Sequence, residues 1–195
     1  MTAKRTLTPD DIISMDDFAA MRADKRRALL PVKKLRRIAL GPWATVYFES
    51  WDTMWLQVHE MLLIEKGGAE QIADELAAYD PLVPKGAELV ATVMFEIDDE
   101  DRRAKVLRSL GGVEEHLYVQ VGDIKAYARP ERDVERTTPD GKTSAVHFLH
   151  FDLDETAVAG FASAAPQALI GCDHANYAHM AALSAASRLE LAKDL

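Results

Sequence analysis

The amino-acid sequence predicts an α+β fold in which helices pack on a mainly antiparallel sheet. Three observations predict it. Residues 117–128 have the pattern of a β-hairpin, residues 88–97 alternate as a central strand does, and residues 51–66 carry apolar side chains nearly all round a helix. The strands are joined by hairpins and helices without regular βαβ alternation, which favours antiparallel pairing.

Length and composition indicate one domain, residues 1–195. The chain is 48% hydrophobic and 28% charged, which is ordinary for a globular protein. No apolar run approaches the roughly 20 residues that a bilayer-spanning helix needs, and the first residues lack the apolar core of a signal peptide. The single cysteine, Cys172, agrees with a reducing compartment. We therefore expect a cytoplasmic protein with no membrane partner.

The net charge of −9 conceals a basic N-terminal region. Residues 1–40 carry a charge of +5, so the remainder carries −14. The basic stretch Arg22–Arg37 predicts a surface that grips an acidic partner, a nucleotide or nucleic acid. The alternatives are a solvated helix face or docking on the acidic remainder of the same chain. The overall acidity argues against nucleic acid, because strong nucleic-acid binders are usually basic overall.

The elements of the first half follow from local signals. Helix-start signals at residues 8–11 and 14–17 predict a basic helical N-terminal segment, about 8–37, that Pro31 interrupts. An extended segment at 36–42 and a strand at 44–49 follow. Two helices (51–66 and 69–78), the strand from Glu88 and a helix capped by Asp98 come next.

The second half begins with the hairpin. A turn at Gly122-Asp123 pairs Val121 with Ile124 and leaves one apolar face. Residues 130–142 are expected to form a loop or a second short hairpin. A strand at 143–153, a helix from about residue 154, a strand at 168–171 and an alanine-rich C-terminal helix complete the prediction, and Asp173 is a natural cap for that helix.

Polar residues interrupt the apolar surface of the predicted helix 51–66. His59 is flanked by large apolar residues three and four positions away, so we expect it to be buried. A carboxylate such as Glu60 in these surroundings is costly without a cation, a metal ion or hydrogen bonds. The structural interpretation pairs Glu60 with an internal partner such as Arg36 or Arg37. The functional interpretation makes it a metal ligand or a general base.

The chain lacks the phosphate-loop, dinucleotide-fold, zinc-protease and paired Cys-x-x-Cys fingerprints. A metal site would therefore have to be assembled across elements. His147 lies on the apolar face of its strand, and residues 173–179 form the densest polar cluster. Oxygen and imidazole ligands suit iron, manganese or zinc. The candidate metal ligands are Glu60, Glu96, His147, His174 and His179.

Four ordered motifs, spread over nearly the whole chain, resemble the bacterial family called domain of unknown function 3501. The motifs are residues 36–42 leading to Tyr47-Phe48-Glu49, residues 57–65, residues 142–149 and Asp173-His174…Tyr177…His179. The resemblance implies no established activity, so whether the protein is an enzyme stays open. It implies that the gene is encoded near those of rubrerythrin-like proteins and iron–sulfur oxidoreductases. These proteins are the partners that we expect.

Three hypotheses follow. The first is a metal-binding or accessory protein of a redox or peroxide-stress system. The second is a non-catalytic binding module that grips an acidic partner, nucleotide or nucleic acid through Arg22–Arg37. The third is a structural subunit whose buried polar groups pair with one another. The residues expected to bind a cofactor are Arg36, Arg37 and Gln57.

Overall fold

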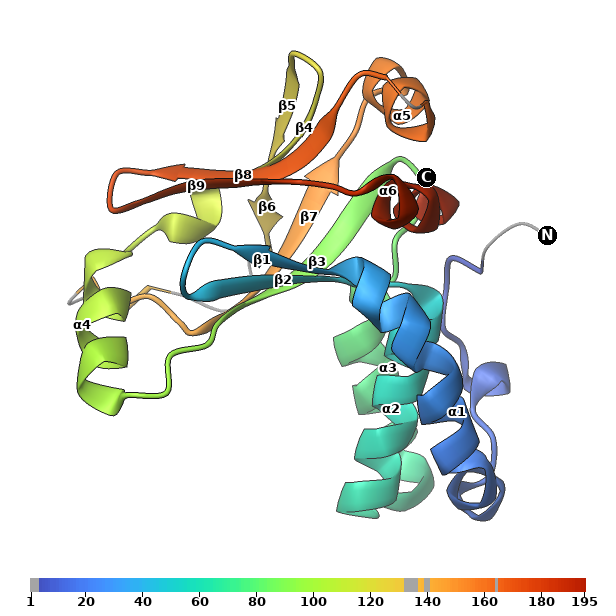
Figure 1. Cartoon of the computed structure of the whole chain (residues 1–195). Helices are drawn as coiled ribbons and strands as arrows, with labels where there is room; N and C mark the ends of the chain where they lie inside the picture. Colours follow the sequence, from blue (N-terminus) through green and yellow to red (C-terminus); the bar gives the residue numbers. More distant parts are fainter. Residues whose placement is uncertain (1–3, 132–136, 139–140, 164) are drawn as a thin grey trace.

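The computed structural model describes residues 4–131, 137–138, 141–163 and 165–195. It confirms the α+β class. In these residues, α-helices pack against two antiparallel sheets, where the sequence predicted one. Figure 1 shows α1, α2 and α3 running together below the sheet region, with α4 standing apart from them.

The larger sheet has the strand order β1-β2-β3-β7-β6, and every neighbouring pair is antiparallel. The prediction of a central strand from Glu88 is confirmed, because β3 lies between β2 and β7. The bounds are β1 (Arg37–Leu40), β2 (Ala44–Phe48), β3 (Glu88–Phe95), β6 (Arg129–Pro130) and β7 (Val146–Asp152).

The smaller sheet has the order β5-β4-β8-β9. The predicted hairpin is confirmed in its register, with Val121 opposite Ile124 and Tyr118 opposite Tyr127. Residues 130–142, expected to form a loop or hairpin, lie partly outside the described residues. The bounds are β4 (Leu117–Val121), β5 (Ile124–Tyr127), β8 (Ala168–His174) and β9 (Tyr177–Ala182).

The C-terminal prediction is wrong at its start. Asp173 does not cap a helix, because β8 continues to His174 and turns at Ala175-Asn176 into β9. The alanines of this stretch favour a helix locally, but the hydrogen bonds between β8 and its two neighbours decide the conformation. The C-terminal helix begins only at Ala185.

The helices are close to those predicted. Ser50 caps α2 and Asp154 caps α5, each through its side chain. Among the helices of the described residues, none combines the length and the apolar character needed to cross a bilayer. The bounds are α1 (Met15–Arg36), α2 (Trp51–Glu65), α3 (Gly68–Tyr79), α4 (Glu100–Ser109), α5 (Glu155–Ala162) and α6 (Ala185–Leu191).

The prediction that Pro31 ends the first helix is wrong, because α1 continues through it to Arg36. An internal proline costs about 3 kcal/mol through the lost hydrogen bond and the clash of its ring. The last turn is held from outside the helix. The guanidinium of Arg36 binds the carboxylates of Glu190 and Asp194 near the C-terminus of the chain.

Two hydrophobic cores lie on opposite faces of the larger sheet. The first core joins the facing sides of the two sheets, where alternate residues of β3, such as Val93, meet residues of β4 and β8, such as Val119 and Ile170. The second core lies among α1, α2 and α3 and includes Val90 from the outer face of β3. The helices are therefore anchored at one end of this outer face.

Candidate functional site

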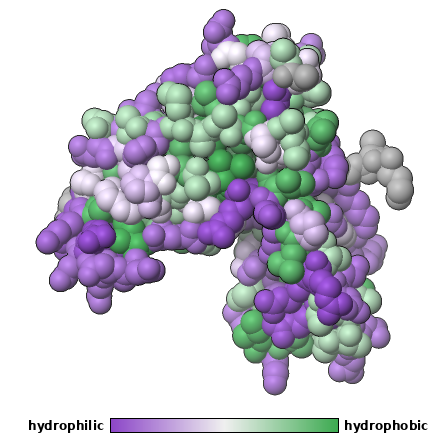
Figure 2. All heavy atoms as spheres, in the orientation of Figure 1, coloured by the Kyte–Doolittle hydropathy of each residue, from purple (hydrophilic) through white to green (hydrophobic). Residues whose placement is uncertain are grey.

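A cavity of about 800 Å³ lies between the helices and the outer face of the larger sheet, and we call it the sheet cavity. Its volume is in the range of small-molecule sites, roughly 300–1,000 Å³. Figure 2 shows the molecule indented between the lobe of α1–α3 and the lobe that carries α4. The lining residues are contributed by α1, β1, β2, α2, β3 and β7, together with Glu49, Leu82 and the end of α3.

One wall of the sheet cavity is a row of side chains across four strands. Arg37 pairs with Tyr47, Tyr47 with Thr92, and Thr92 with Phe148. Side chains of directly paired residues share one face of a sheet, so the four lie side by side. This row gives the wall a cationic end at Arg37 and an apolar end at Phe148.

A second wall comes from the start of α2. Glu49, Thr53 and Gln57 are spaced by four residues, which places them on one side of the helix and the residue before it. Both oxygens of the Glu49 carboxyl accept hydrogen bonds, from Thr92 Oγ1 at 2.7 Å and from Thr53 Oγ1 at 2.7 Å. Gln57 lies beside Tyr79, with 3.5 Å between the amide nitrogen and the phenol oxygen.

Glu49 is an unusual carboxyl for this chain. Burial raises its pKa, and the threonine hydroxyls and the more distant charges of Lys33 and Arg36 only partly oppose that effect. Within the described residues its side chain forms no ion pair, in contrast to Glu60 and Asp194. The sheet cavity therefore contains an acid whose charged form is poorly compensated by the protein.

The third wall is cationic. Leu30, Lys33 and Lys34 line the sheet cavity from one face of α1, at the spacing i, i+3, i+4, and Arg37 follows as the first residue of β1. The side chains of Lys33 and Lys34 are exposed, and neither forms an ion pair in the part of the chain that the structure describes. Arg37 contacts Glu96 at 3.5 Å and lies over the Tyr47 ring. We call Lys33, Lys34 and Arg37 the cationic rim.

Arg36 also lines the sheet cavity, but its charge is already used. Its nitrogens donate to the carboxylates of Glu190 and Asp194 at 2.6–3.2 Å and to the carbonyl oxygen of Glu49 at 3.0 Å. It therefore fixes the backbone of Glu49 and joins α1 to the C-terminus. The role of Arg36 is therefore to hold these segments in position.

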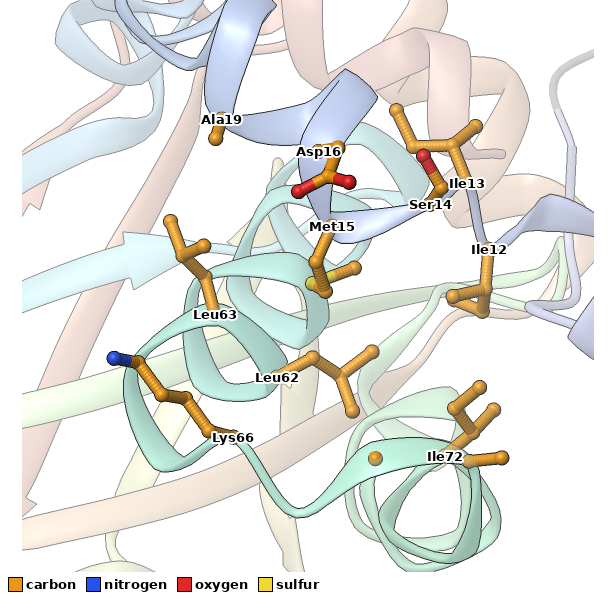
Figure 3. Close-up of a pocket in the computed structure, with 12 residues that line it drawn as sticks. Ile12, Ile13, Ser14, Met15, Asp16, Ala19, Leu62, Leu63, Lys66 and Ile72 are labelled. Atoms are coloured by element: carbon orange, nitrogen blue, oxygen red, sulfur yellow. The ribbon is translucent and has the colours of Figure 1, made fainter.

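A second cavity, of about 530 Å³, lies between the start of α1 and the facing ends of α2 and α3. Figure 3 shows Ile12, Met15, Leu62 and Ile72 around it. Its lining is mostly apolar, and Asp16 and Lys66 supply its only charges among the described residues. This helix cavity lacks the combination of charged and hydrogen-bonding groups found in the sheet cavity.

Comparison with known proteins identifies the family of the chain. The family model DUF3501, described as a protein of unknown function, matches residues 6–195. The chain belongs to the DUF3501 family. The crystal structure of a novel protein of unknown function from Burkholderia pseudomallei K96243 is 37% identical, covers 97% of this chain and 99% of its own, and superimposes with a TM-score of 0.89. No curated protein matched the chain.

In this DUF3501 protein the three residues predicted to bind a cofactor line one cavity. Arg36, Arg37 and Gln57 all line the sheet cavity. Glu96, a predicted metal ligand, lies beside it. The Glu96 carboxylate accepts hydrogen bonds from Thr45 and Tyr47, which lower its pKa, and it contacts Arg37. Through these contacts Glu96 holds Tyr47 and Arg37, two residues of the cavity wall, in place.

The other predicted metal ligands are dispersed. Glu60 binds Arg22, which lowers the pKa of Glu60, so its partner is an internal cation, as the structural interpretation expected, but not Arg36 or Arg37. Arg22 lies on α1 and Glu60 on α2, so their contact depends on the packing of two helices and has no local signal in the sequence. Among the described residues, no group of three His, Cys, Asp or Glu side chains is placed to hold a metal ion.

The predicted histidines each have a local structural environment. His147 is fully buried, with Nε2 2.9 Å from the carbonyl oxygen of Ser144. The Nδ1 of His174 accepts from the amide of Asn176. His179 packs on the Tyr177 ring at 4.6 Å between ring centroids. The five candidate metal ligands of the DUF3501 protein therefore occupy separate places in the fold.

His59 is buried, as expected, and is bonded on both sides. Its Nδ1 lies 2.7 Å from the carbonyl oxygen of Trp55, and its Nε2 accepts from the amide of Ile13. Burial lowers its pKa, which favours the neutral ring that this arrangement requires. His59 thus holds the segment that precedes α1 against α2.

The sequence analysis missed Glu49 and Thr92 as site residues. A partial signal exists, because Glu49, Thr53 and Gln57 repeat every four residues where a strand gives way to a helix. Thr92 offers no such signal, since it reaches Glu49 only through the pairing of β2 with β3. The two lysines were included only as members of the basic stretch.

Proposed function

We propose that this protein is a binding module that holds a small amphipathic anion in the sheet cavity. The observation that carries the proposal is the meeting of Lys33 and Lys34, which lack ion-pair partners among the described residues, with a cavity that has a substantial apolar lining. Leu30, Met94 and Phe148 supply accessible surface for an apolar body, and the cationic rim supplies charge for an anionic group. A recurring design of ligand sites is apolar walls with a few placed polar groups.

The proposal narrows the idea of a basic stretch that grips acidic partners. Arg26 and Arg27 belong to that stretch but do not line the cavity, and Arg27 pairs with Asp24 on the exposed side of α1. A polyanion would use the whole stretch, whereas a small anion in the cavity would use only the rim. Substitutions of Lys33 and Lys34 can therefore be compared with substitutions of Arg26 and Arg27 to distinguish a small anion from a polyanion.

The test is a fluorescence titration with the 2,6 isomer of anilinonaphthalenesulfonate, an apolar anion, and with uncharged N-phenylnaphthylamine. We expect the sulfonate to bind at one site per chain and more tightly than the uncharged probe. In the double variant Lys33→Glu, Lys34→Glu its affinity should fall about tenfold or more, since two attractive charges become repulsive. The affinity for the uncharged probe should change little.

The matched control is Arg26→Glu, Arg27→Glu, which changes the net charge by the same amount on the same helix. We expect it to leave sulfonate binding within about twofold, because screening weakens charges beyond roughly 10 Å. Equal losses in both double variants would show a diffuse electrostatic effect and contradict a site at the rim. Loss of heparin retention in both would instead support a polyanion.

The redox role implied by the family resemblance, with a rubrerythrin-like or iron–sulfur partner, is a separate hypothesis with a separate test. Elemental analysis of protein purified without a metal-affinity resin would detect stoichiometric iron, manganese or zinc. A bound metal should also raise the melting temperature, because a ligand that binds only the folded state stabilises it. Neither result bears on anion binding in the sheet cavity.

A further inference from the structure

We propose that the anion held in the sheet cavity also carries an N–H or O–H donor, which hydrogen-bonds to the carboxylate of Glu49. The inference rests on the proposed function and specifies its ligand further. It concerns the end of the ligand away from the anionic group. The cavity would then select bipolar molecules, with an anion at one end, a donor at the other and an apolar body between them.

The first argument is the unused capacity of the carboxylate. An ionised carboxylate has about four acceptor positions, and the described protein groups that bond to it fill two, from Thr53 and Thr92. Both threonines approach from the walls, one from α2 and one from β3, and Glu49 itself lines the cavity. Lone pairs therefore remain for a donor that enters the cavity.

The second argument is the energetic state of this group. A carboxylate that is removed from water is unfavourable unless donors or a cation compensate it. Arg36, the cation that hydrogen-bonds to the backbone of Glu49, directs its guanidinium to Glu190 and Asp194 and donates to Glu49 only at its carbonyl oxygen. A ligand donor supplies the missing compensation, and it does so only when the ligand is bound.

The third argument is the separation of charge within the cavity. The cationic rim belongs to the end of α1 and the start of β1, whereas Glu49 precedes α2 and is fixed between Thr53 and Thr92. Gln57 and Tyr79 add further polar atoms on the α2–α3 side. A purely anionic ligand would satisfy the rim and leave the carboxylate of Glu49 without an added donor.

The experiment compares two probes that differ at one nitrogen, where a methyl group replaces the hydrogen of the donor. The 2,6 isomer of anilinonaphthalenesulfonate has an N–H at one end and a sulfonate at the other, and its N-methyl derivative lacks the N–H. We expect the wild-type protein to bind the N–H probe about tenfold more tightly, as a hydrogen bond to a charged group would give. Binding of the two probes within about twofold of each other would overturn the inference.

The variants assign the preference to Glu49. Glu49→Leu removes the acceptor and should bring the affinities of the two probes within about twofold. Glu49→Gln retains the shape of the side chain and should reduce the preference to about threefold, because a neutral acceptor forms the weaker hydrogen bond. It also serves as the test if the leucine variant does not fold. A preference that survives Glu49→Leu, or one undiminished in Glu49→Gln, would overturn the assignment.

Glu60→Gln is the matched control. It neutralises a glutamate of α2, the helix that follows Glu49, and Glu60 does not line the cavity. We expect it to keep the full preference for the N–H probe, and loss of the preference there would count against Glu49. Failure of the proposed function looks different from failure of this inference. If the proposed function fails, reversing the charges of Lys33 and Lys34 leaves the affinities for both sulfonate probes unchanged. If only this inference fails, the reversal weakens both probes equally, and the wild-type protein shows no preference for the N–H probe.

Discussion

Two charged regions meet at Glu49, and they differ in how completely the protein satisfies them. In the first, Arg36 is buried, with 3% of its surface exposed, and donates to Glu190, Asp194 and the Glu49 carbonyl oxygen. In the second, the side chain of Glu49 and the cations Lys33 and Lys34 line the same cavity without ion pairs among the described residues. We call these the closed and the open cluster.

The difference teaches how to separate structural charge from functional charge. Burial raises the pKa of Asp194 and of Glu49 alike, so a raised pKa alone does not distinguish the clusters. The partners do. Asp194 binds Arg36 through both oxygens, whereas Glu49 has only two hydroxyl groups. The predictions below test whether the closed cluster carries stability and the open one does not.

The largest expected effect is in the closed cluster. Arg36→Met leaves the buried carboxylate of Asp194 without its main cation and that of Glu190 with only Lys193, so the free energy of unfolding should fall by about 3–5 kcal/mol. Denaturant unfolding at neutral pH measures it. Arg37→Met is the control, because this exposed neighbour makes a surface pair with Glu96 and should cost about 1 kcal/mol or less. Similar losses in both variants would remove the distinction.

The open cluster should respond in the opposite direction. Because burial raises the pKa of Glu49, the stability that its proton provides is fully present below the ordinary glutamate pKa. It is lost as pH rises through the raised pKa of the folded state. Glutamine cannot lose this proton. Glu49→Gln should therefore become increasingly stable relative to wild type as pH rises through this window, by at most about 1.4 kcal/mol per pH unit.

Unfolding in urea over a series of pH values gives this comparison. Asp194 also has a raised pKa but is present in both proteins, so its contribution cancels. Parallel pH profiles of wild type and Glu49→Gln would mean that the carboxyl titrates equally in the folded and unfolded states. The open cluster would then lose its energetic distinction.

The sequence predicted most of the local structure for a physical reason. Caps, turn residues and hydrophobic periods act over a few positions, so α2 and the β4–β5 hairpin appeared with their bounds or register. Pro31 and residues 173–182 were misread because distant partners decide them. The Arg36 network holds the end of α1, and hydrogen bonds to β8 hold β9.

The sequence predicted some residues of the candidate site but not how the fold brings them together. Arg36, Arg37 and Gln57 stood out as charged or polar residues beside apolar segments, and all three line the sheet cavity. The wall from Arg37 to Phe148 depends on the register of β1, β2, β3 and β7, which are far apart in the chain. No local pattern places Thr92 opposite Tyr47.

The smallest expected effect concerns Glu60, which lies between the two extremes. Arg22 binds it through two nitrogens, but the side chain of Arg22 is 37% exposed, so solvent screens the pair. Glu60→Gln should lower the free energy of unfolding by about 0.5–1 kcal/mol, and added salt should reduce the difference. Since Arg22 lowers the pKa of Glu60, this stability is present above the ordinary glutamate pKa and is lost as pH falls through the lowered one.

A double-mutant cycle with Arg22→Met measures how much of this loss belongs to the pair. A coupling energy near the full loss identifies Glu60 as a satisfied structural acid of the closed type. A coupling energy near zero, with a melting temperature that iron, manganese or zinc raises in wild type but not in Glu60→Gln, would assign this carboxylate to a metal. The comparison between the clusters would then have to include α2 as a third, metal-dependent region.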